Sequence, residues 1–201
     1  NKQAAVDTVA LSSLINSEKL NVKLVDTIEN FSEEFELLTE YATLLVRNGR
    51  GEEALGILKT NQQSLTVSGN QLLVSLLLEK RKFEEASIVV ENWLSEDTPS
   101  KAAVMAKLGV LVSQGKYQDA VSYAQQMQDS FADDPRLEVF LFQLHKDNEN
   151  YVDANLIIER LRSKSVPIAL IELFKSELAI AQKQYEQATR HLENSHNNNP
   201  K

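Results

Sequence analysis

The sequence predicts an all-α fold, an α-solenoid of stacked antiparallel helix pairs with about 10–12 helices in total. Three observations carry this prediction. A six-residue motif recurs at an almost constant interval, apolar residues follow helical spacing between its copies, and only 6 glycines and 4 prolines occur in 201 residues. Self-similarity at such a period is typical of repeat architectures, in which each helix pair needs its neighbours to bury its apolar face.

The recurring motif combines a turn residue, an aromatic residue and an alanine, and its clearest copy runs from Gly115 through Tyr117 to Ala120. The glycine is expected to end the first helix of a pair in a left-handed conformation, which other residues adopt at a cost. We expect Asn48 and Asn148 to tolerate the same conformation at weaker copies. The alanine is expected where two helices approach closely. The motif alanines are Ala54, Ala86, Ala120, Ala154 and Ala188, at steps of 32, 34, 34 and 34 residues.

The aromatic residue, three positions before the alanine, is expected to fill the wedge between the second helix and its neighbours, because a large ring buries much area. The copies that carry it are Phe83, Tyr117, Tyr151 and Tyr185, while Gly51 replaces it in the weakest copy.

This pattern resembles the tetratricopeptide repeat, a 34-residue helix-turn-helix. The resemblance rests on the period, Gly115, the motif aromatics and alanines, and Pro200, which lies twelve residues after Ala188. The large aromatic and glycine that open the first helix of that repeat are not found in order, and Pro99, Pro135 and Pro167 are displaced. A related helical repeat, such as the Sel1-like repeat, is therefore an alternative.

We expect one solenoid over residues 1–201, with helix pairs at about 1–34, 35–66, 67–100, 101–134, 135–168 and 169–201. Residues 1–34 lack the motif and form either a degenerate pair or a terminal cap. Trp93 and Met127, each seven residues after a motif alanine, are expected in the core. The chain begins with Asn1 and ends where another repeat would begin, so we expect it to be a fragment of a longer protein.

The composition excludes several classes of function. With 29 acidic and 21 basic residues, the net charge of −8 argues against binding to nucleic acid or to an anionic membrane surface. The absence of cysteine excludes disulfides and thiol catalysis. No apolar run approaches the ~20 residues that a membrane span needs.

Candidate catalytic groups are few. His145 lies near Asp147, but a partly exposed histidine at a helix end explains it better than a catalytic base. His191 and His196 are five residues apart and do not share a helical face as zinc ligands would. The acidic pair Glu52-Glu53 falls in the first turn of a predicted helix, where negative charge is stabilising. We therefore expect no catalytic residue, no cofactor and no metal site, and predict that the chain is not an enzyme.

The resemblance implies that the first helices of the pairs line a concave groove that holds a peptide or a helix of a partner protein. Counting back from the turn motif gives the groove residues Thr39, Thr43, Gln71, Ser75, Met105, Val112, Val139, Gln143, Leu173 and Ile180. A register one residue earlier also fits the apolar pattern of several helices, and it would turn Val74, Leu77, Phe142 and His145 inward instead.

The groove positions are mainly neutral or apolar, and they lack the Lys, Arg and Asn set with which some members of the repeat family grip a C-terminal carboxylate. We therefore predict a protein-interaction scaffold that binds an apolar peptide or helix, or a second copy of itself. The lack of cysteine and a surface rich in Asn, Gln and Ser favour the envelope, secretion or polysaccharide machinery of a bacterium over a cytoplasmic adaptor. The alternative is a regulatory repeat region of a larger protein whose catalytic domain lies outside these residues.

Overall fold

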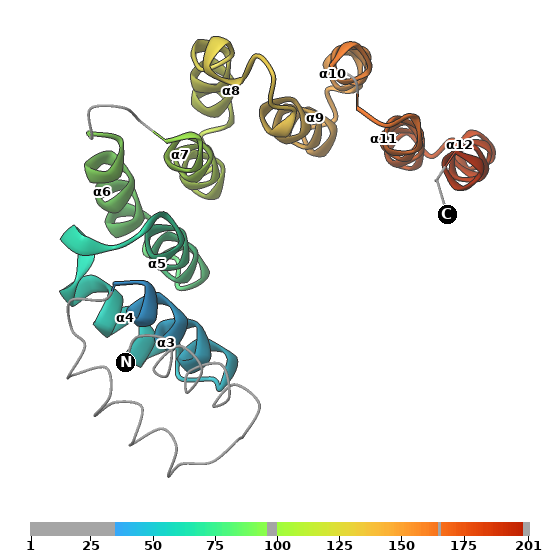
Figure 1. Ribbon diagram of the computed structural model, residues 1–201. Coiled ribbons are helices and arrows are strands. Elements are labelled where there is room, and N and C mark those ends of the chain that lie inside the picture. The colour runs from blue at the N-terminus through green and yellow to red at the C-terminus, as the bar shows by residue number, and fades with distance from the viewer. Residues whose placement is uncertain (1–34, 96–99, 165, 199–201) are drawn as a thin grey trace. The chain divides into compact units, whose positions relative to one another are not determined.

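The computed structural model of the protein describes residues 35–95, 100–164 and 166–198, and the regular structure within these ranges is entirely helical (Figure 1). This confirms the predicted all-α fold. The predicted pair at 1–34, and the prolines Pro99 and Pro200, lie outside the described residues. The α-helices are α3 (Phe35–Arg47), α4 (Gly51–Thr60), α5 (Val67–Glu79), α6 (Phe83–Leu94), α7 (Lys101–Ser113), α8 (Tyr117–Gln126), α9 (Arg136–Asp147), α10 (Tyr151–Ser163), α11 (Ile168–Ala181) and α12 (Tyr185–Asn197), with short 3-10 helices η1 (Gln62–Ser64) and η2 (Asp129–Phe131).

The chain divides into two compact units between Gln114 and Gly115. In the first unit, α3 packs on α4 and α5 packs on α6. In the second unit, α9 packs on α10 and α11 packs on α12. A turn of three residues joins the two helices of each of these pairs. The unit boundary falls between α7 and α8, which the sequence placed in one pair, and the predicted division into helix pairs of a single solenoid stays a prediction.

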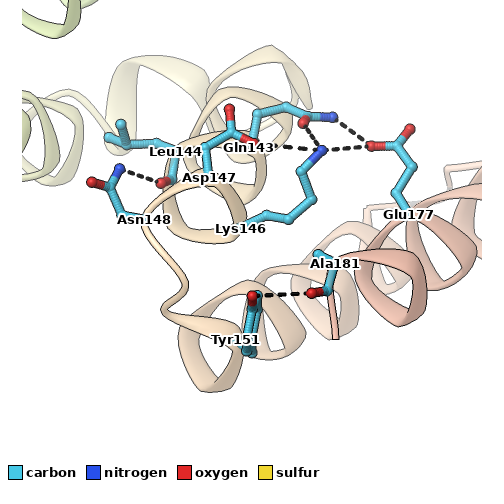
Figure 2. A network of polar contacts seen from close by, with 8 residues as sticks. All are labelled: Gln143, Leu144, Lys146, Asp147, Asn148, Tyr151, Glu177 and Ala181. Atoms are coloured by element: carbon cyan, nitrogen blue, oxygen red, sulfur yellow. Dashed lines mark hydrogen bonds and ion pairs between the residues drawn. The ribbon is translucent and has the colours of Figure 1, made fainter. Parts of the chain in front are cut away.

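Each motif turn contains one residue in the left-handed conformation, and it is always the first residue of the motif: Gly49, Arg81, Gly115, Glu149 and Lys183, with φ between 57° and 75°. The expectation for Asn148 was wrong, because its φ is −95°. Its side-chain amide instead donates to the carbonyl of Leu144 at 2.8 Å (Figure 2). Asn48 makes the same bond to Leu44 at 2.9 Å. Both asparagines therefore satisfy carbonyl groups that a helix end leaves without a partner.

The five motif alanines are buried, as the close approach of paired helices requires. The motif aromatics differ from one another. Phe83 and Tyr151 are half-buried, whereas Tyr117 and Tyr185 are exposed. The expected filling of a wedge therefore fails at two of the four positions. For Tyr185 the reason is that no helix follows α12 in the described part of the chain.

The two predicted core residues also differ. Trp93 is buried, as expected. Met127 is only half-buried, because α8 ends at Gln126 and Met127 is its C-terminal capping residue. The prediction for Met127 assumed a longer second helix.

In the first unit, α3 and α5 approach each other closely at Gly69. A Cβ atom added to Gly69 would lie 2.9 Å from Oγ1 of Thr39, so only glycine fits without a shift of its neighbours.

In the second unit, a largely buried ion pair joins α9 to the C-terminal end of α10. The ammonium of Lys164, at the end of α10, lies 2.6 Å from the carboxylate of Glu138 on α9. The same ammonium donates to the carbonyl of Phe131 in η2 at 3.0 Å.

Candidate functional site

The first helices of the second unit, α9 and α11, are joined by a network of polar side chains (Figure 2). The amide of Gln143 donates to the carboxylate of Glu177 at 2.9 Å, and the ammonium of Lys146 donates to the same oxygen at 3.0 Å. Lys146 also donates to the side-chain carbonyl of Gln143. Three side chains from two helices thus satisfy one another, and the charges of Lys146 and Glu177 are paired.

An aromatic layer lies beneath this network. The rings of Phe142 and Phe174 have their centroids 5.0 Å apart and are tilted by 56°, a favourable arrangement for two aromatic rings. The ammonium of Lys146 lies 5.6 Å from the centroid of the Phe142 ring, within the range of a cation–π contact. Because both rings are buried, they set the spacing between α9 and α11.

Tyr151 holds the end of α11 in place. Its hydroxyl donates to the carbonyl of Ala181 at 3.1 Å, in the last turn of that helix (Figure 2). This carbonyl is one of the four at a helix C-terminus that have no partner within the helix. The motif aromatic of one repeat therefore fixes the first helix of the next.

Exposed aliphatic side chains lie along α11. Leu170, Leu173 and Ile180 are 38%, 37% and 50% exposed. With Glu177 they are spaced at i, i+3, i+7 and i+10, which places all four within about 80° of arc on one side of the helix. We call the surface formed by Val139, Gln143, Lys146, Leu170, Leu173, Glu177 and Ile180 the α9–α11 face.

All ten predicted groove residues lie on first helices of the pairs. Val139, Gln143, Leu173 and Ile180 belong to the α9–α11 face of the second unit. In the first unit, Gln71 and Ser75 are exposed on α5, and Thr43, Met105 and Val112 are half-buried. Thr39 is only 7% exposed, and its hydroxyl oxygen lies 3.3 Å from that of Thr66. The binding role of these ten residues stays a prediction.

The alternative register is not compatible with the structure. Val74, Leu77 and Phe142 are buried in the cores of their units, so they cannot line an open groove. His145 is half-buried and lies about 160° around α9 from Gln143.

Sequence reasoning missed Lys146, Leu170 and Glu177. Each lies three or four residues from a predicted groove residue on the same helix, and that spacing would have identified them.

Several polar and charged side chains of α11 and α12 are engaged with one another. His191 on α12 has its Nδ1 atom 2.7 Å from the carboxylate of Glu172 on α11, and Lys175 lies 3.0 Å from the other oxygen. Burial raises the pKa of Glu172, but hydrogen bonds from His191, Lys175 and Asn194 outweigh burial and lower that pKa to about 2. Glu172 is therefore ionised, and its hydrogen bonds join α11 to α12.

Neither a metal site nor a membrane span is found within the described ranges. No cluster of three or more His, Asp and Glu side chains there is placed to hold a metal ion. None of the helices described here has the length and apolar character needed to cross a membrane.

The comparisons with known proteins concern the fold. No protein-family model matches the sequence, and no curated protein matches it. A tetratricopeptide repeat protein from Parabacteroides merdae ATCC 43184 is similar in structure, with a TM-score of 0.69 and 15% identity over 91% of this chain and 72% of that chain. YrrB, a TPR protein with an unusual peptide-binding site, gives a TM-score of 0.52 and 15% identity over 85% of this chain and 89% of its own. The protein therefore has the fold of tetratricopeptide repeat proteins, as its motif predicted.

Proposed function

We propose that the chain is a non-catalytic protein-interaction module that binds an apolar peptide or helix of a partner protein on the α9–α11 face. The observation that carries this proposal is the row of exposed aliphatic side chains, Leu170, Leu173 and Ile180, beside polar residues that already satisfy one another. Burial of each large aliphatic side chain contributes about 1.5–3 kcal/mol when it is complete. Because these side chains are 37–50% exposed, a partner gains roughly that share of the energy, and it does so without having to neutralise a charge.

The spacing of the row favours a helical partner. Side chains at i, i+3, i+7 and i+10 follow the pattern with which two helices pack along a shared seam. Glu177 interrupts the aliphatic row, and its carboxylate is held by Gln143 and Lys146. A partner helix with a small or polar residue opposite Glu177 fits this row better than a uniformly apolar helix.

The likeness to YrrB, whose description mentions a peptide-binding site, supports an interaction role but does not decide it, since one fold hosts many functions. From composition alone we extend the proposal to a bacterial envelope or secretion context. The alternative is a regulatory repeat region of a larger enzyme. The sequence that flanks this chain in its gene distinguishes the two.

The proposal is tested with peptides selected on the purified chain from a display library of helical and linear sequences. We expect Leu173→Lys and Ile180→Lys to weaken binding of the selected peptides at least about tenfold, because each places an unpaired charge in an apolar contact. Leu192→Lys, at a comparably exposed leucine on α12, is the matched control and should change affinity less than about twofold. Equal effects of all three variants would place the contact elsewhere.

The predicted groove residues of the two units are compared in the same assay. Met105→Lys and Val139→Lys, one in each unit, separate a contact with α7 from a contact with α9. Circular dichroism of each variant verifies that it is folded. Sedimentation of the chain at several concentrations tests whether a second copy is the partner.

A further inference from the structure

A cavity of about 440 Å³ lies in the second unit between α8 and α10, with α9 as its floor. Its volume falls in the range of small-ligand sites. The equivalent junction one repeat later, between α10 and α12, has a cavity of about 260 Å³. There the hydroxyl of Tyr151 donates a hydrogen bond to the last residue of α11. Tyr117 is the counterpart of Tyr151 34 residues earlier, and it is exposed and lines the larger cavity.

The linkers explain why α8 stands apart from α10. Nine residues, 127–135, connect α8 to α9, whereas only four residues, 164–167, connect α10 to α11. The longer linker contains Phe131, whose side chain is fully buried and whose carbonyl accepts a hydrogen bond from Lys164. Lys164 is in turn held by the buried carboxylate of Glu138. The linker is therefore fixed to the end of α10, and the spacing between α8 and α10 is part of the packed structure.

The centre of the cavity is apolar. Val121 from α8 and Ile157 from α10 face each other across a floor made by Leu141 and Leu144 of α9. This arrangement suits one aliphatic side chain, which would be surrounded by aliphatic carbon on three sides.

Polar groups lie on both sides of this centre. Gln118 and Gln125 line the α8 wall seven residues apart, which corresponds to roughly 10 Å along a helix. Each amide offers both donors and an acceptor, as an extended peptide backbone requires. Three residues of extended chain span about the same 10 Å.

One acidic and one basic side chain, Asp153 and Arg160, line the cavity, and they do not form an ion pair with each other. Asp153 accepts a hydrogen bond from Asn150 at 2.6 Å. Arg160 lines the cavity from the last turn of α10, and no ion pair of its guanidinium is found within the described ranges. The cavity therefore complements a ligand with a negative charge at that end.

We propose that the α8–α10 cavity binds a short extended peptide segment with an aliphatic side chain at its centre and an acidic side chain at the Arg160 end. This site goes beyond the proposed function, because its floor residues Leu141 and Leu144 lie on the opposite side of α9 from Gln143 and Lys146. The two surfaces can be occupied or lost independently.

The test is an NMR titration of the full 201-residue chain with the blocked peptide acetyl-Ser-Leu-Ser-Glu-amide, using amide signals of Val121 and Ile157 as reporters. We expect saturable shifts at these residues, and weaker binding when leucine is replaced by serine. Replacing the glutamate by glutamine should weaken binding roughly two- to fivefold, the range of an exposed ion pair.

Variants identify the residues responsible. Arg160→Gln should abolish the preference for glutamate over glutamine, whereas Arg162→Gln, on the same helix and outside the cavity lining, should retain it. Ile180→Lys on the α9–α11 face should leave the titration unchanged.

Several results would overturn the proposal. They are the absence of saturable shifts at Val121 and Ile157 up to roughly 10 mM peptide, equal affinity for the leucine and serine peptides, and a glutamate preference that survives Arg160→Gln. Loss of binding in Ile180→Lys with normal binding in Arg160→Gln would assign the peptide to the α9–α11 face instead.

Discussion

Neighbouring first helices are joined in different ways in the two units. In the first unit, α3 and α5 approach so closely at Gly69 that a methyl group would contact the hydroxyl of Thr39. In the second unit, α9 and α11 are joined by the long side chains of Gln143, Lys146 and Glu177 over a pair of phenylalanine rings. Thr39 is consequently buried, while Leu173, at the same position of its repeat, is exposed.

The difference follows from the residue at one repeat position. Gly69, Ala103, Leu137 and Ile171 are separated by 34 residues each, and all four are buried. At this position the first unit thus carries small residues and the second unit carries large residues. A small residue lets helices approach until their backbones nearly touch, whereas a large one requires side chains to bridge the space. The second arrangement leaves aliphatic groups available for a partner.

The largest effect is expected from removal of the aromatic layer. Phe142→Ala should lower the free energy of unfolding by about 3–5 kcal/mol, because a fully buried ring is replaced by a cavity. The measurement is urea unfolding monitored by circular dichroism. A loss below about 1 kcal/mol would mean that α9 and α11 do not depend on the rings for their spacing.

Acid should weaken the contact between α11 and α12. Because the pKa of Glu172 is lowered to about 2 in the folded chain, its stabilising effect is complete above the unfolded pKa of about 4.3 and is lost as the pH falls towards 2. The stability advantage of the native chain over Glu172→Gln should shrink by up to about 3 kcal/mol between pH 6 and pH 2.

The contact between α3 and the N-terminal end of α5 includes the hydroxyls of Thr39 and Thr66, which do not titrate between pH 6 and pH 2. Amide hydrogen exchange at Leu44 and Ile180 compares the two regions in one sample. An equal fall in the protection factors of both amides on acidification would contradict a specific role of Glu172.

Gly69→Ala should destabilise the chain by about 1–3 kcal/mol through overpacking against Thr39. The matched control is Gly109→Ala on α7, where an added Cβ meets no atom within 4 Å. That substitution should instead stabilise the helix by up to about 1 kcal/mol. Thermal unfolding measures the stability of both variants. Effects of the same sign would show that the close approach at Gly69 does not disfavour an added methyl group.

The smallest effects are expected at the turns, where the two units are alike. Gly49→Ala in the first unit should cost about 1 kcal/mol, because alanine resists the left-handed conformation. Lys183→Gly in the second unit should stabilise the chain by a similar amount, because Lys183 already adopts that conformation. Chemical unfolding of both variants measures these changes in stability. A destabilised Lys183→Gly chain would indicate that the lysine side chain has a structural contact of its own.

The sequence predicted those features that depend on local chemistry. The turns and the motif alanines are set by a few adjacent residues, so a repeated motif such as Gly115 to Ala120 identifies them. The exposure of Tyr117 could not be predicted, because it depends on a linker in which Phe131 is buried and bonded to Lys164, 33 residues away.

The candidate site was predicted in part for the same reason. The turn motif placed Gln143 and Leu173 on the first helices of their pairs, α9 and α11, whereas the pairing of Lys146 with Glu177 depends on the distance between these helices. That distance is determined by the packing of Phe142 on Phe174, which a helical periodicity alone does not reveal.

The left-handed residue of each turn offers a way to attach chemical labels. Its role depends on the backbone, and the side chains of Arg81, Glu149 and Lys183 are all exposed. The chain contains no cysteine, so a single introduced thiol at any of these sites would react alone. Spin labels or fluorophores at positions 81 and 149, one in each unit, would measure the separation of the units in solution and its change when a peptide binds.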